Sequence, residues 1–207
     1  METKRTLLHD LSGFHFEGLL GKLPDDIDII DAAPAVRHCI GCYACWFRTP
    51  GRCAQTDRAQ DFAPGLLETD ELIIISRLCY GGFSPDVKAF MDRSIPNLIP
   101  FFRKSPDGSR TFHKRRGDAP SKLTCYFYSL AGAPPDSALV AGADDKRSLM
   151  EVATEHADDS SLATRAPQES ELTLMRDIIK SVAFNMSVPE WSAGYVGDMS
   201  ELRGVSL

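Results

Sequence analysis

The sequence is short of positive charge and of long apolar runs. Its 207 residues include 23 Lys and Arg against 29 Asp and Glu, which gives a formal net charge of -6 at pH 7. An acidic surface repels phosphate groups on average, so a nucleic-acid partner or an anionic membrane partner is not expected. No apolar run approaches membrane-spanning length. Residues 1–10 also lack the apolar segment and small-residue cleavage site of a secretory signal, and a cytoplasmic location is therefore expected.

The sequence also lacks an acid and base pair that would identify a catalytic proton donor, so the catalytic residues are left unassigned. The remaining composition is ordinary, with 43% hydrophobic and 25% charged residues. This length and composition predict a single globular domain over residues 1–207. Two stretches could interrupt it, a polar excursion at residues 103–122 and a poorly patterned segment at residues 131–168.

Strand-like and helix-like patterns alternate along the chain. Strands are expected at residues 6–8, 27–30, 71–76, 123–130 and 194–196, of which the continuous apolar run 72–75 suits a central parallel strand. Helices are expected at residues 11–23, 57–68 (interrupted by Pro64 and Gly65), 84–95 (ended by Pro96) and 171–186. The alternation predicts an α/β fold, a flavodoxin-like doubly wound five-stranded parallel sheet with helices on both faces. Ligands of such sheets bind at the carboxyl ends of the strands.

Four of the six cysteines lie close together in the sequence, at Cys39, Cys42, Cys45 and Cys53. In a reducing compartment such a group indicates a metal, cluster or redox site before it indicates disulfides. Three thiols at i, i+3 and i+6 with a fourth eight residues later can hold a [4Fe–4S] cluster. A zinc site is a second interpretation, although structural zinc more often uses two separated Cys-x-x-Cys pairs. A third is a set of structural or redox-active thiols in a tight loop.

The loop that follows the central strand, residues 76–84, is the second stretch with chemical content. Gly81 and Gly82 allow close approach of the backbone to a planar ligand, and Tyr80 and Phe83 could cover an aromatic ring. Ser84, followed by proline and aspartate, is a strong helix start whose free N–H groups could serve a ligand. The alternative is a glycine turn that leads into a well-capped helix, and Cys79 in this loop could be ordinary packing.

A basic run, residues 113–116, lies between two predicted strands. It could bind the phosphate of a nucleotide, or it could be a solvated loop. His9 and Asp10 end the first predicted strand, which places them near the ligand edge of this fold. There they could contact a ligand or form an ordinary surface pair.

Taken together, these segments resemble the flavodoxin family proteins grouped with the NAD(P)H-dependent FMN reductases and iron–sulfur flavoproteins. The resemblance rests on residues 39–53, 73–76 and 80–85, and on Val87-Lys88 with Asp92-Arg93. It implies a flavodoxin-like fold, bound FMN, two-electron chemistry with a nicotinamide donor and an unidentified electron acceptor, and a homodimer or homotetramer. The residues expected to contact FMN are His9, Asp10, Leu11, Ser76, Arg77, Leu78, Cys79, Tyr80, Gly81, Gly82, Phe83, Tyr128 and Ser129.

Family members usually carry a Gly-Ser-Pro-Arg or hydroxyl-rich loop after the first strand, which cradles the FMN phosphate. Here the same position begins with His9 and Asp10 and has one hydroxyl, Ser12. Two alternatives to an FMN oxidoreductase therefore stay open. One is a flavodoxin-like scaffold that has lost its cofactor and acts through a partner, and the other is a redox protein that works through its cysteines.

Overall fold

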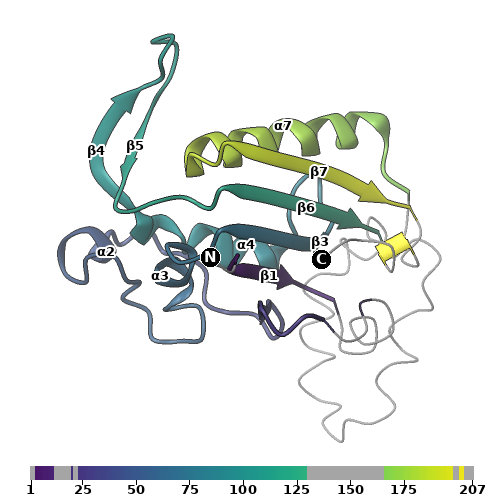
Figure 1. Cartoon of the computed structure of the whole chain (residues 1–207), viewed down its shortest axis with the longest axis horizontal. Helices are drawn as coiled ribbons and strands as arrows, with labels where there is room; N and C mark the ends of the chain where they lie inside the picture. The colour runs from purple at the N-terminus through teal and green to yellow at the C-terminus, as the bar shows by residue number, and fades with distance from the viewer. Residues whose placement is uncertain (1–2, 12–19, 21–22, 130–165, 198–200, 203–207) are drawn as a thin grey trace, which may run out of the picture.

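A computed structural model describes residues 3–11, 20, 23–129, 166–197 and 201–202. Five strands form one parallel sheet in the order β2-β1-β3-β6-β7 (Figure 1). They are β1 (Arg5–His9), β2 (Ile27–Asp31), β3 (Glu71–Arg77), β6 (Lys122–Tyr128) and β7 (Glu190–Val196). The prediction of a five-stranded parallel sheet with a central strand at residues 71–76 is confirmed.

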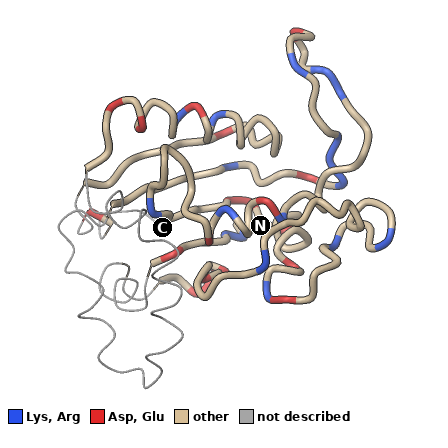
Figure 2. The backbone as a smooth tube through the Cα atoms, turned by 180° about the vertical axis from the view of Figure 1, so that it is seen from behind, with Lys and Arg blue, Asp and Glu red and all other residues tan. Residues whose placement is uncertain are grey.

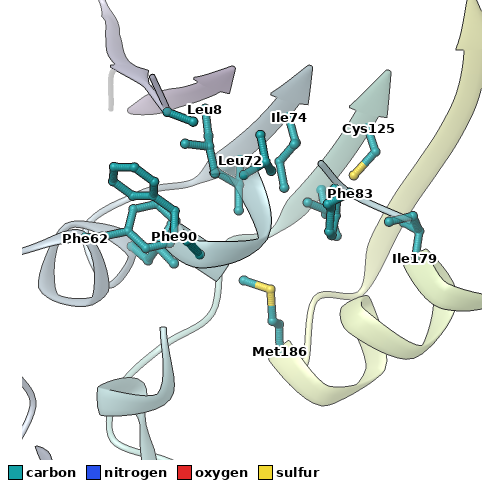
Figure 3. Packing of buried hydrophobic residues seen from close by; sticks show 14 of the residues in the cluster. Leu8, Phe62, Leu72, Ile74, Phe83, Phe90, Cys125, Ile179 and Met186 are labelled. Atoms are coloured by element: carbon teal, nitrogen blue, oxygen red, sulfur yellow. The ribbon is translucent and has the colours of Figure 1, made fainter. Parts of the chain in front are cut away.

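The core lies on both faces of the sheet because neighbouring residues of a strand point to opposite sides. On β3, Leu72 and Ile74 belong to one apolar cluster, and Ile73 and Ile75 belong to the other. The first cluster is the larger and lies under the helices that follow β3 and precede β7 (Figure 3). A strand that is buried on both faces reads as a continuous apolar run, which is why β3 was the clearest strand in the sequence.

The helices that cover the first face include α4 (Pro85–Asp92) and α7 (Glu169–Met186). α4 begins as predicted, because the Ser84 side chain accepts a hydrogen bond from the Val87 amide and Pro85 occupies the first helical position. α7 begins with a capping box in which Gln168 and Glu171 bond each other's backbone amides. Met175 and Ile179 lie on its buried face.

Two helix predictions were partly wrong. Pro64 and Gly65 do not interrupt a helix but lie inside α3 (Phe62–Leu66). Pro64 is tolerated because it stands in the first turn, where backbone N–H groups have no intrahelical partner. α4 ends at Asp92 rather than near Ile95, and Pro96 belongs to a separate 3-10 turn, η1 (Ile95–Asn97).

The predicted polar excursion is a projecting hairpin. β4 (Leu98–Lys104) and β5 (Thr111–Arg115) pair antiparallel and extend away from the main sheet (Figure 1). Basic residues gather along this hairpin (Figure 2). The basic run 113–116 therefore begins on a strand, and the expectation of a loop there was wrong. Most of the hairpin is exposed, so the apolar alternation that reveals a strand is weak.

Some expectations fall outside the described residues. Most of the helix expected at 11–23 does, and so does nearly all of the segment 131–168. Among the helices that the structure describes, none has the length and apolar character needed to cross a membrane.

The turn between β3 and α4 packs against α7. Tyr80 and Gly81 both have positive φ, at 50° and 77°, and form the tip of a hairpin in which Cys79 and Gly82 exchange backbone hydrogen bonds. A Cβ atom at Gly81 would lie 2.8 Å from Leu174 Cδ2 on α7. Glycine is therefore favoured at position 81 for two reasons: the backbone is left-handed there, and α7 packs too closely for a side chain.

We expect Gly81→Ala to lower the free energy of unfolding by about 2–4 kcal/mol, from the left-handed backbone and from overpacking against Leu174. Gly108→Ala is the matched control, because Gly108 has a φ of 70° but a Cβ added there would meet no atom within 4 Å. Gly108→Ala should lower the free energy of unfolding by about 1–2 kcal/mol, because of the left-handed backbone alone. Urea unfolding measures both values, and equal losses would contradict the packing explanation.

Candidate functional site

The carboxyl edge of the sheet brings together most of the residues predicted to contact FMN. His9 pairs with Ile75, and β3 continues for two residues to Arg77, which pairs with Tyr128 at the end of β6. Residues 9–11, 76–79 and 128–129 thus meet at one edge. This edge includes the point between β1 and β3 where the strand order reverses, which is the ligand position in flavodoxin-like sheets.

Asp10 is the centre of this edge. Its carboxylate accepts hydrogen bonds from the Arg77 amide at 3.0 and 3.1 Å and from the Tyr128 hydroxyl at 3.0 Å. Burial raises the pKa of the Asp10 carboxyl, and its interactions with Ser84, Arg77 and Tyr128 offset only part of that rise. The carboxylate therefore joins the ends of β3 and β6 to the end of β1.

Other predicted residues of the edge are buried in the protein. Ser76 is fully buried, and its hydroxyl accepts from the Ser84 amide at 3.0 Å. Ser129 and Tyr195 share a hydrogen bond of 2.7 Å between their hydroxyls. His9 is 3% exposed, and burial lowers the pKa of its imidazole. Leu11 is buried as well and belongs to the second apolar cluster.

Some side chains of the loop after β3 are buried in the core, and others are exposed at the surface. Phe83 is buried and stacks on Phe127, with ring centroids 5.4 Å apart, whereas Tyr80 is 66% exposed. Leu78 is buried, and its amide bonds the Tyr128 carbonyl at 2.8 Å. A Cβ at Gly82 would meet other atoms only at 3.7 Å, so this glycine leaves room beside Cys79.

A groove of about 560 Å³ runs along α4 between that helix and α7. Cys79, Tyr80 and Gly82 line the end near the β3 loop, and Asn97 and Arg115 line the end beyond α4. Its volume and mostly apolar wall are typical of small-molecule sites. Sequence reasoning missed it because it is formed by helices far apart in the chain.

The basic run lies on the hairpin, at the amino end of β6. The Arg115 guanidinium donates to the carbonyls of Met186, Gly117 and Asp118, and Arg116 Nε donates to the Pro96 carbonyl. These bonds anchor the hairpin to the body of the protein. They do not place the two arginines at the carboxyl edge.

The four clustered cysteines line one small cavity of about 50 Å³ at the far end of α4. Cys53 is buried, Cys42 is exposed, and Cys39 and Cys45 are intermediate. The backbone has positive φ at residues 41 and 43, and α2 (Ala44–Phe47) follows at once, so the loop curls around the cavity. Burial and the neighbouring Cys53, Cys39 and Cys42 raise the pKa of the Cys45 thiol.

All six cysteines lie in the described part of the chain, and none forms a disulfide. Within that part, no three or more His, Cys, Asp or Glu side chains are arranged to hold a single metal ion. In a [4Fe–4S] cluster each cysteine binds a different iron, so the four sulfurs need not converge on one point.

Arg93 completes the cysteine cavity and was missed as a site residue. The sequence offered a signal only in the pair Asp92-Arg93, which was one part of the family resemblance. Arg93 is 1% exposed and forms an ion pair of 2.5 Å with Asp57. Burial lowers the pKa of the Arg93 guanidinium, but Asp57 and Cys53 outweigh it, and the pKa lies above its ordinary value.

The strand order defines the class of protein: it corresponds to the 2-1-3-4-5 order of flavodoxin-like α/β folds. No protein-family model and no curated protein matches the sequence. Solved structures similar to the chain include several reductases.

One such structure is an NADPH-quinone reductase from P. pentosaceus, at 12% identity and a TM-score of 0.44 over 95% of this chain and 85% of that one. Another is an FMN-dependent NADH-azoreductase from Bacillus anthracis in complex with FMN, at 10% identity and a TM-score of 0.48 over 98% and 93%. A third is an NAD(P)H:quinone oxidoreductase from Methanothermobacter marburgensis, at 10% identity and a TM-score of 0.49 over 98% and 91%. At these values the assignment of the fold rests on the strand order itself.

The raised pKa of Asp10 predicts a pH dependence of stability. The folded protein binds this proton more tightly than the unfolded chain does, so stability is lost as pH rises from the ordinary aspartate pKa through the folded one. Asp10→Asn should remove this loss of stability. Tyr128→Phe removes a hydrogen-bond donor to the ionised carboxylate, so the loss of stability with rising pH should become steeper. Urea unfolding from pH 4 to 7 measures the slopes, and parallel curves for the three proteins would refute the assignment.

Proposed function

We propose that the chain is an FMN-binding oxidoreductase that takes electrons from a nicotinamide donor. The observation that carries the proposal is the convergence of residues 9–11, 76–79 and 128–129 at the carboxyl edge beside the reversal of strand order. These segments are far apart in the sequence, and the resemblance to FMN reductases implies a ligand contact for each of them.

The loop after β3 is the part of this edge that would contact the flavin ring. Tyr80 is exposed and could cover an aromatic ring, and Gly82 has no side chain to obstruct a ligand beside the loop. When bound, FMN would supply the hydride and electron chemistry. The protein would supply orientation, because the turn at residues 79–82 is held by its paired backbone hydrogen bonds and by packing against α7.

Asp10 sets the electrostatics of the same edge. As a carboxylate at the end of β1 it disfavours a phosphate close by, which agrees with the unusual first loop of the sequence. The residues that would receive the phosphate, in the stretch after Leu11, lie outside the described residues. FMN binding would therefore depend more on contacts with the ring than is usual for the family.

The first test is an ultraviolet–visible spectrum of protein purified without air. We expect a flavin envelope, and Gly82→Trp should weaken FMN binding by about tenfold or more, because the new ring fills the space beside the loop. Gly194→Trp is the matched control, since Gly194 is on β7 with no atom within 4 Å of a Cβ position. Colourless protein that takes up no added FMN would reject the proposal and favour a scaffold without a cofactor.

A second candidate function, as an iron–sulfur electron carrier, is favoured by the shared cavity of the four cysteines. Cys39, Cys42, Cys45 and Cys53 would hold a [4Fe–4S] cluster, which supplies one-electron transfer. The donor set fits, because four cysteine thiolates can bind the four irons and the buried Arg93 guanidinium would offset part of the net negative charge.

Cys42→Ser should abolish iron binding, measured as iron per chain after purification without air, and should leave FMN content nearly unchanged. Cys125→Ser is the control, since Cys125 is buried in the core away from the cavity. Retention of iron by the Cys42 variant would show that this cysteine is not a ligand.

A further inference from the structure

Arg93 is an unusual residue to find at the cysteine cavity. It stands at the end of α4, its side chain is among the largest that are fully buried, and it lines the cavity with all four cysteines. A buried guanidinium requires partners for its charge and for each N–H group.

Two of its nitrogens have such partners around the cysteine segment. Nη1 donates to Asp57 Oδ2 at 2.5 Å and to the Arg37 carbonyl at 3.2 Å, and Nη2 donates to the Gln55 carbonyl at 3.0 Å. These bonds join the end of α4 to both arms of the cysteine segment.

The third guanidinium nitrogen, Nε, has no such partner. Arg93 Nε is buried and forms no hydrogen bond with any described atom. Buried N–H groups without a partner are rare in folded proteins, and one at a candidate site indicates a missing acceptor. Cys53 lies close enough to interact with the guanidinium, and it is the most buried of the four thiols around the cavity.

We propose that Arg93 is a positioning residue for the cysteine site and that its Nε–H group donates a hydrogen bond to the Cys53 sulfur when that sulfur is a cluster-bound thiolate. This inference rests on the proposed cluster. Hydrogen bonds to the sulfurs and nearby positive charge stabilise the more reduced, more negative state, and so they raise the reduction potential. Arg93 accordingly tunes the potential of the site as well as holding its loop.

The test compares the wild-type protein with Arg93→Met and Arg93→Lys after anaerobic reconstitution with ferrous iron and sulfide. The readouts are iron per chain, FMN per chain, the thermal midpoint and the reduction potential of the cluster. Arg93→Met should shift the potential to more negative values and bind several-fold less iron. Arg93→Lys keeps the charge but lacks the Nε–H group, and its potential should lie between the two.

Arg52→Met is the matched control. Arg52 precedes Cys53 in the chain, but it is exposed and pairs with Asp61 at the surface, so its loss should leave the potential unchanged. If Arg93 has only a structural role, its variants will have a lower thermal midpoint but an unchanged reduction potential. That result overturns the proposal. If Arg93→Met does not fold, an unchanged potential in Arg93→Lys overturns it equally.

Failure of the wild-type protein to take up iron would overturn both the cluster and the role of Arg93. The FMN content of the same samples reports separately on the flavin. An iron-free protein with full FMN would therefore reject the cysteine site alone.

Discussion

The hydrogen bonds to the Asp10 carboxylate hold the carboxyl edge together. β1 ends one residue before Asp10, and the carboxylate then reaches the Arg77 amide at the end of β3 and the Tyr128 hydroxyl at the end of β6. The ends of β3 and β6 are thus joined to the end of β1 through one acceptor, at the edge where a ligand is expected.

α4 links this edge to the cysteine cavity. Its first end is capped by Ser84, and beyond its last residue Arg93 is tied to Asp57. Its 8 residues span about 12 Å, which sets the spacing between the two candidate sites along the helix. Because both ends are anchored by buried hydrogen bonds, the two sites are held at a fixed separation within the chain.

The sequence predicted the parts of the fold whose signals are local or apolar. β3 was visible as a buried run, and α4 was visible from Ser84 and Pro85 at its start. It also predicted that His9, Ser76 and Tyr128 lie near one another, because parallel strands end at a common edge. The hairpin was not predicted because β4 contains Pro100 and exposes Phe101 and Phe102, and β5 is mostly polar, so neither burial nor alternation marks these strands.

The candidate sites show a sharper limit to such reasoning. The sequence suggests that Gly81 and Gly82 leave space for a ligand, but Leu174 occupies the space beside Gly81. No local sequence pattern predicts this contact, because Leu174 lies far along the chain. Arg93 likewise reads as an ordinary helix-end cation, and only the fold shows that it is buried among four thiols. The chemistry-bearing residues could be identified from spacing, whereas the groups that position them are set by long-range packing. In this protein those groups include Leu174 on α7 and Arg93 at the end of α4, so the two helices together organise the candidate sites.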